Sequence, residues 1–221
     1  MRDTARMEYY LVPSRQLPIS YAKSLVPALV LGFLLPTIAL YLPFDDPGFT
    51  LKQALVAFWQ PTPLYVNLLL LLLSPLLDAF APSATSEKAD GDAAYVRLLY
   101  IICFFVSAAA HCGTMVLFAR DTKISFARTF LPHTELLPHS AAETLHFIFQ
   151  WDYLIIFGAS LLWACVAVHD LHSMESADIS LAIMGLMIVA GSIVCGPAAT
   201  VVGAFWWREG RMRDGGKKKV L

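Results

Sequence analysis

The sequence predicts an all-α fold, a polytopic transmembrane helical bundle of about five spans, which forms a single integral-membrane domain over residues 1–221. Two observations support this prediction. Of the 221 residues, 57% are hydrophobic and only 15% are charged, whereas soluble domains carry about 25% charged residues. Five apolar segments are also long enough to cross a bilayer, which takes about 20 residues in a helix. These segments cover residues 24–44, 53–77, 98–119, 144–169 and 179–207.

The first segment, 24–44, contains no charged residue. It follows 23 mostly polar residues, its apolar run is long for a signal peptide, and no small-residue cleavage site comes after it. We therefore expect it to remain in the mature protein as a span. The sequence FDDPG at 44–48 then predicts a turn, because proline and glycine adjoin there.

The second segment, 53–77, has two prolines near its first third, with Gln60 before them and Asn67 after them. Pro61 and Pro63 each lack a backbone donor, so they predict a kink in this helix. One interpretation is that Trp59, Gln60 and Asn67 face an internal pocket, because freed carbonyls at membrane depth need protein or a cavity around them. The other is an interfacial Trp59–Gln60 pair at the end of a shorter span. We expect a kink with Gln60 pointing inward.

The fourth segment, 144–169, contains a carboxylate at Asp152, between Trp151 and Tyr153. Placing a carboxylate at bilayer depth costs roughly 2.5–3.5 kcal/mol on insertion scales, so such residues usually have a function. Helical geometry puts Ile148, Ile156, Ala159 and Trp163 on the same side as Asp152. In an apolar setting the neutral acid is favoured and can donate a proton. The alternative is a structural hydrogen bond to a neighbouring helix, for example to His111 in the third segment, 98–119.

A second face of the same helix carries His146, Gln150 and Tyr153, at spacings of four and three residues. These side chains are candidates for lining the same cavity, and a purely structural role is the alternative for His146 and for His111. No metal site is predicted, because no two histidines stand four residues apart on one helix and His169 and His172 are expected in a loop. No cofactor is predicted either.

The fifth segment, 179–207, repeats small residues every four positions, which predicts one flat face for close helix packing, with a bend at Pro197. These residues are Ser192, Gly196, Thr200 and Ala204. Six basic residues follow between Arg208 and Lys219, and an Arg208–Glu209 ion pair is expected among them.

Basic residues mark cytoplasmic sides, so 208–221 is predicted to be a cytoplasmic tail. The connection between the third and fourth segments shares that side, because it carries Arg120, Lys123 and Arg128. The basic N-terminal region, which contains Arg2, Arg6, Arg15 and Lys23, conflicts with five spans. Either one segment does not span or further helices precede this chain. The net charge of −1 gives no reason to expect a nucleic-acid partner.

Four stretches together resemble the fungal integral-membrane terpene cyclases of meroterpenoid pathways, the family of the membrane-bound cyclase of ascofuranone biosynthesis. They are LVPALVLGFLLPTIALYLPF, AFWQPTPLYVNLL, FQWDYLIIFGASLLWA and GPAATVVGAFWWRE. The resemblance implies cyclisation of a farnesyl-type chain, commonly after another enzyme has installed a terminal epoxide. It also implies a hydrophobic prenylated substrate, contact with membrane lipid, an endoplasmic-reticulum location and possible association with other enzymes of the pathway. Such cyclases use no aspartate-rich diphosphate motif, and this sequence has none.

The residues fit acid-initiated cyclisation on chemical grounds as well. A neutral acid in a dry pocket can open an epoxide or protonate an alkene, and we predict Asp152 as this catalytic residue. Aromatic faces stabilise the cation that follows, for which Phe149 is also available. The predicted substrate-binding residues are Trp59, Gln60, Asn67, His111, His146, Gln150, Trp151, Tyr153 and Trp163. The alternatives are a non-enzymatic binding, scaffold or transport protein and a membrane isomerase of the sterol type.

Overall fold

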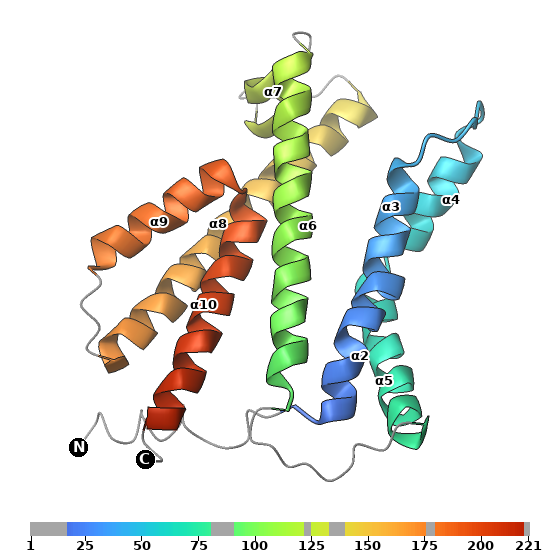
Figure 1. The fold of residues 1–221 in the computed structure, drawn as a ribbon. Coiled ribbons are helices and arrows are strands. Elements are labelled where there is room, and N and C mark those ends of the chain that lie inside the picture. Colours follow the sequence, from blue (N-terminus) through green and yellow to red (C-terminus); the bar gives the residue numbers. More distant parts are fainter. Residues whose placement is uncertain (1–16, 81–90, 122–124, 133–139, 176–179, 219–221) are drawn as a thin grey trace. The chain divides into compact units, whose positions relative to one another are not determined.

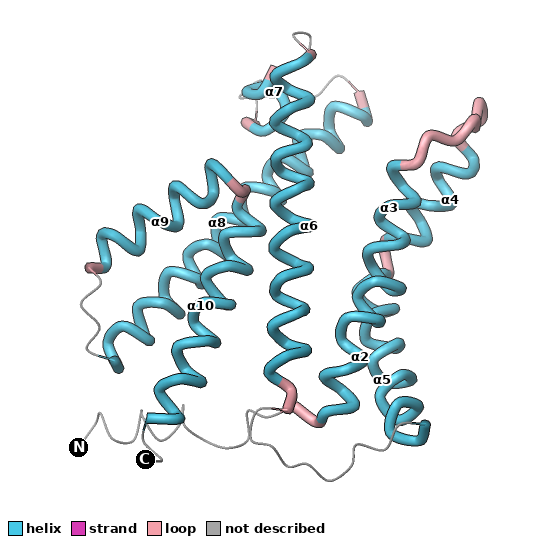
Figure 2. Tube along the Cα trace, viewed as in Figure 1, coloured by secondary structure: helices cyan, strands magenta, loops and turns pink. Residues whose placement is uncertain are grey.

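The computed structural model describes residues 17–80, 91–121, 125–132, 140–175 and 180–218. Within these ranges all regular secondary structure is helical (Figures 1 and 2), which confirms the all-α fold class. The chain divides into two units, Met1–Leu99 and Tyr100–Leu221, and each is described here by itself. Among the described residues, four helical segments are long and apolar enough to cross a membrane. They are Ile19–Tyr41, Thr62–Phe80, Ala93–Arg120 and Glu143–Leu171.

The first span is one continuous helical run made of α2 (Ile19–Leu29), the π-helical turn η2 (Val30–Leu34) and α3 (Leu35–Tyr41). Ser20, Ser24, Ala28 and Gly32 repeat every four residues along it and are all buried. This face packs against α5 (Thr62–Phe80), where a Cβ atom added to Gly32 would lie 2.9 Å from the backbone nitrogen of Val66. Small residues therefore let the two backbones approach closely, as they do in many membrane helix pairs.

The predicted turn at 44–48 is confirmed. The backbone nitrogen of Phe49 donates to the carbonyl of Asp46 at 3.0 Å, and Phe49 adopts a left-handed conformation with φ 55°. The Asp46 carboxylate accepts a hydrogen bond from the backbone nitrogen of Lys52 at 2.9 Å, in the first turn of α4 (Thr50–Trp59). The Lys52 ammonium group donates in turn to the carbonyl of Leu40, so this turn holds α4 against α3.

The prolines of the second segment do more than kink it. Helix α4 ends at Trp59 and α5 begins at Thr62, so the predicted single span over 53–77 is wrong and α5 alone has the length of a span. Pro61 cannot donate to the preceding turn, while Pro63 lies in the first turn of α5, where no donor is needed. The backbone nitrogen of Gln60 still donates to the carbonyl of Val56, as in a helix, and the side chain of Gln60 is exposed. The inward orientation expected for Gln60 stays a prediction, since the first unit is described by itself.

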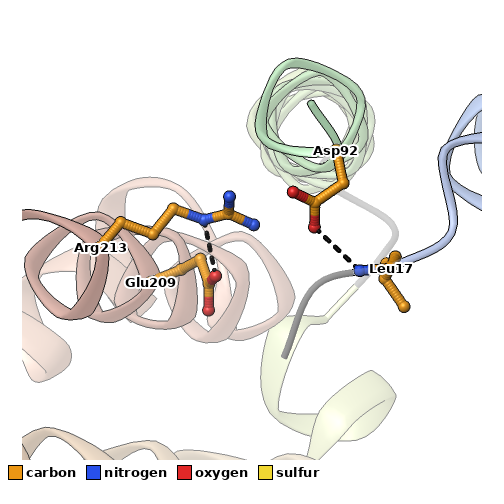
Figure 3. Close-up of polar contacts among 4 residues, drawn as sticks. All are labelled: Leu17, Asp92, Glu209 and Arg213. Atoms are coloured by element: carbon orange, nitrogen blue, oxygen red, sulfur yellow. Dashed lines mark hydrogen bonds and ion pairs between the residues drawn. The ribbon is translucent and has the colours of Figure 1, made fainter. Parts of the chain in front are cut away.

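Asp92 anchors the start of α6 within the first unit. This carboxylate is buried and accepts a hydrogen bond from the backbone nitrogen of Leu17 at 3.3 Å, just before α2 (Figure 3). A charged acceptor on a backbone donor makes a strong contact between segments that are 75 residues apart.

The second unit contains most of α6 (Ala93–Arg120), the short α7 (Phe126–Phe130) and three further helices, α8 (Ala141–Glu175), α9 (Leu181–Val194) and α10 (Pro197–Lys218). Helix α8 continues past the predicted boundary at 169. His169 and His172 therefore lie on the helix, which corrects their expected place in a loop. Among the described residues, no three His, Cys, Asp or Glu side chains group as a metal site would require.

The prediction of one fifth span over 179–207 is wrong, because that segment is broken at Cys195 and Gly196. Gly196 has φ 90°, a conformation that residues with a Cβ rarely adopt, and Pro197 then starts α10 with no donor to lose. The two helices meet at this break like the arms of a V (Figure 1). The small residues consequently do not form one flat face. Small residues instead let α9 and α10 approach each other near the break. A Cβ atom on Gly191 would lie 2.9 Å from the Thr200 hydroxyl oxygen.

The expected Arg208–Glu209 ion pair is also replaced. Consecutive residues on a helix point about 100° apart, whereas residues four apart lie on the same side. Glu209 therefore pairs with Arg213 at 2.9 Å (Figure 3), and Arg208 donates to the carbonyl of Ala167 on α8 at 3.2 Å.

Candidate functional site

Asp152 lies in the membrane-spanning part of α8. It comes nine residues after Glu143, where this span begins, which corresponds to about 14 Å along the helix at the standard rise. The span ends 19 residues further on, at Leu171, so Asp152 lies inside the span and away from both of its ends.

The side chain of Asp152 is exposed on the second unit, as are those of Ile148, Ile156, Ala159 and Trp163. The residues of α8 that are buried, which include Gln150, Ala164 and Val168, point to other sides of the helix. Within the described part of the chain, Asp152 makes no hydrogen bond or ion pair. This unit therefore presents a carboxyl group without a partner on an apolar helix face.

The proposed structural pairing of Asp152 with His111 does not form. His111 instead donates through its Nε2 to the carbonyl of Ile193 at 3.1 Å, where α9 ends. Asn67 in the first unit also has a backbone partner. Its side-chain amide donates to the carbonyl of Pro63 on the same helix at 2.8 Å. These two residues have backbone partners in the structure, which favours structural roles for both.

Gln150 and His146 fasten α7 to α8. The amide of Gln150 donates to the carbonyls of Arg128 and Thr129 at 2.7 and 3.1 Å, and Nε2 of His146 lies 3.1 Å from the same Arg128 oxygen. Gln150 is only 4% exposed, so its amide satisfies carbonyls at the end of a short helix in a buried place. This favours a positioning role for the two side chains.

Tyr153 belongs to an aromatic cluster that the sequence analysis missed. Neighbouring rings in this cluster have centroids 4.7–5.8 Å apart, a spacing typical of packed aromatic pairs. The cluster fixes α7 against the ends of α6 and α8 that adjoin it. Its members are Phe118, Phe126, Phe130, Tyr153 and Phe157. The four-residue spacings of Phe126 and Phe130 and of Tyr153 and Phe157 are its local signals in the sequence.

The predicted tryptophans occupy separate places. Trp151 packs edge-on against Phe147, and Trp163, which is 64% exposed, packs on Phe205 of α10 with centroids 4.7 Å apart. Trp59 belongs to the first unit, where its Nε1 donates to the Thr37 hydroxyl at 2.9 Å and so joins α4 to α3. Trp59, Gln60 and Asn67 thus lie in one unit and the remaining candidates in the other. A pocket shared by all of them stays a prediction.

Comparison with known proteins gives one family and several relatives. Residues 4–212 match the CtvD domain. Terpene cyclase ascI of Acremonium egyptiacum is 26% identical over 85% of this chain and 50% of its own length, and terpene cyclase sdgD of Emericella nidulans is 31% identical over 71% and 42%. The FAD-dependent monooxygenase verC1 of Penicillium polonicum is 26% identical over 88% of this chain but only 24% of its own length.

The chain spans about half the length of the curated cyclases that it matches. No solved structure matches it. The family match nevertheless extends across both units and includes Asp152 and its helix. The chain therefore belongs to the CtvD domain family.

Proposed function

We propose that this chain is a membrane-bound terpene cyclase that protonates a terminal epoxide or alkene of a prenylated, meroterpenoid substrate and so starts its cyclisation. The observation that supports this most is Asp152, a carboxyl group without a partner among the described residues, on a span of a chain whose relatives include proteins named terpene cyclases. The substrate class and the reaction are carried over from those relatives as part of the proposal.

The proposed reaction begins when the neutral Asp152 carboxyl gives its proton to the epoxide oxygen. The carbon–oxygen bond breaks as a nearby alkene attacks the same carbon, which forms a ring bond and leaves a cation further along the chain. Loss of one proton to a base then restores an alkene. The proton released equals the proton given, so the product is an isomer of the substrate. Proton donation of this kind is worth about 10²–10⁴-fold in rate.

The surroundings of Asp152 suit this role. Ile148 and Ile156 on its helix face offer only hydrocarbon, which keeps water from the cation. Trp151 directly precedes it and Phe149 comes three residues before it; both are exposed, so their rings are available to a bound prenyl group. A cation over an aromatic face gains roughly 0.5–2 kcal/mol.

The match to a monooxygenase favours an epoxide as the group that is protonated. About a quarter of verC1 corresponds to this chain, in a protein named for an oxidation that needs FAD. Flavin monooxygenases can convert an alkene into an epoxide, which opens under acid far more readily than an alkene protonates. We propose that the substrate reaches the cyclase from such an oxidation, laterally through an endoplasmic-reticulum membrane and with other enzymes of the same pathway nearby.

Microsomes that contain the chain test this proposal, with empty-vector microsomes as the control. A farnesyl-phenol with a terminal epoxide and the matched farnesyl-phenol without it are supplied in parallel. We expect a cyclic isomer of unchanged mass from the epoxide alone. Conversion of the alkene substrate alone would show that the protonated group is an alkene carbon and not an epoxide oxygen. Conversion of neither, with the protein present in the membrane, would contradict cyclase activity for this chain.

A further inference from the structure

We propose that residues 180–218 form a re-entrant hairpin, in which α9 and α10 enter the membrane from the same side and meet inside it at Gly196, held there by His111 of α6. This inference concerns how the chain is threaded through the bilayer and does not depend on the proposed cyclase activity.

The lengths of the two helices support re-entry. Helix α9 has 14 residues, which is about 21 Å at 1.5 Å per residue. The apolar part of α10 runs from Pro197 to Trp207 before Arg208, which is about 16 Å on the same scale. A hydrocarbon core is about 30 Å thick. Each arm is therefore too short to cross the membrane and long enough to reach its interior.

Contacts along α10 show which way it runs. Gly196 lies against His111 and Gly203 lies against Phe104, so α10 runs antiparallel to α6. Trp163 packs on Phe205, and Ala167 accepts a hydrogen bond from Arg208, so α10 runs parallel to α8. The C-terminal end of α10 is thus near the end of α8 from which the chain leads into α9.

The break at Gly196 lies deep along α6. His111 is 13 residues beyond Leu98, the first apolar residue after Arg97, which corresponds to about 20 Å along the helix. Non-helical backbone at that depth is tolerated only when its polar groups find partners in the protein or in a water-filled cavity. The hairpin therefore needs donors at its tip.

α6 and the tip itself supply these donors. His111 donates to the carbonyl of Ile193, and the Cys112 thiol lies 3.8 Å from the carbonyl of Val194. The backbone nitrogen of Cys195 donates to Gly191, and the Thr200 hydroxyl donates to the carbonyl of Gly196. Gly196 permits this contact, because a Cβ atom there would lie 2.6 Å from Cγ of His111.

The hairpin has a consequence for the charged regions. Helices α6 and α8 are joined beyond Arg120, at the opposite end of α6 from the end that α10 approaches. If α6 and α8 span, the basic tail after Trp207 and the basic connection that contains Arg128 lie on opposite sides of the membrane. The expectation that both are cytoplasmic fails under this proposal.

Glycosylation mapping of the full chain in microsomes tests the threading. An acceptor site is placed, one at a time, in the connection between α6 and α8, in the connection between α8 and α9, and after Leu221. We expect the second and third sites to behave alike and the first to behave oppositely, whichever side is the lumen. Agreement between the first and third sites against the second would overturn the hairpin, as would modification of all three.

Two substitutions at His111 test the clamp itself. His111→Gln keeps an N–H donor at similar reach, whereas His111→Phe keeps a ring of similar bulk without the donor. We expect His111→Phe to lower the melting temperature of the detergent-solubilised protein by several degrees, and His111→Gln to recover at least half of that loss. Equal melting temperatures for His111→Phe and the wild type would show that His111 does not hold the tip.

Discussion

Replacing Gly196 with alanine tests the tip of the α9–α10 segment, and the size of the effect follows from two features of the structure. An alanine at φ 90° is strained by about 1–2 kcal/mol, since its Cβ crowds the backbone in this left-handed region. The same Cβ would lie 2.6 Å from Cγ of His111, closer than two such atoms can approach. The imidazole must therefore move away.

Movement of the His111 ring breaks its hydrogen bond to the carbonyl of Ile193. This carbonyl is exposed on the second unit by itself, and inside the membrane, where the proposed hairpin places it, an acceptor without its donor costs about 1–3 kcal/mol. Together with the strain, we expect Gly196→Ala to destabilise the fold by about 3 kcal/mol, or roughly 100-fold in the folding equilibrium. On the scale of soluble proteins of this length, that corresponds to a fall of roughly 6–12 °C in melting temperature.

Gly158→Ala is the matched control. Gly158 lies in the middle of α8, and nothing lies within 4 Å of where its Cβ would be. Alanine favours helix over glycine by roughly 0.5–1 kcal/mol, so this variant should melt at or slightly above the wild-type temperature. Both proteins are solubilised in one detergent and followed by loss of the monodisperse peak after heating. Equal melting temperatures for Gly196→Ala and Gly158→Ala would refute the account of the tip.

Three further substitutions test contacts in the separate units by the same heating assay. Gly32→Ala should destabilise by about 1–3 kcal/mol, because its Cβ would press on backbone atoms of Val66 that cannot rotate away, and unchanged melting would contradict the close packing of α5. Trp59→Phe should cost about 1 kcal/mol, and the effect should vanish in a Thr37→Val background if their hydrogen bond is its cause. Gln150→Leu should cost about 1–2 kcal/mol, because it leaves the Thr129 carbonyl at the end of α7 without its side-chain donor while His146 still lies against the Arg128 carbonyl, and a neutral result would argue against that capping role.

The fold class and most segments could be predicted from hydrophobicity alone, because a helix is the form in which a single segment satisfies its own backbone in lipid. A kink before α5 could also be predicted, since Pro61 cannot donate to the preceding turn, although the helix ends there and a new one begins. At Gly196 the sequence predicts only a bend, although glycine followed by proline is a common signal for a turn. The periodic small residues around it concealed that signal by matching a straight helix.

The same spacing of small residues occurs in the first span. Ser20, Ser24, Ala28 and Gly32 follow the four-residue pattern that also occurs near the C-terminus, and here the face does pack a neighbouring helix. The sequence therefore suffices to predict a close helix contact at Gly32. It does not identify Val66 on α5 as the partner residue.

Long-range partners could not be predicted in this way. His111 and Ile193 are separated by 82 residues, and nothing local indicates that this ring serves a carbonyl. Gln150 likewise reaches 22 residues back to Arg128, which changes its interpretation from substrate contact to helix cap. Asp152 stood out for a different reason. The cost of a carboxyl group in an apolar span depends on its own segment alone, so the sequence was sufficient to single it out.

The measurement that tests the central claim most directly compares Asp152→Asn with wild type in microsomes supplied with the epoxide substrate. Product and protein level are measured in the same preparation, and Asp170→Asn, at the far end of the same span, controls for loss of a carboxylate on α8. Asparagine keeps the size of the side chain but cannot act as the acid. We expect cyclisation to fall at least about 100-fold in Asp152→Asn at unchanged protein level, with wild-type turnover in Asp170→Asn. Near wild-type turnover in Asp152→Asn would contradict Asp152 as the proton donor, whereas loss of the variant from the membrane would favour a structural role for Asp152.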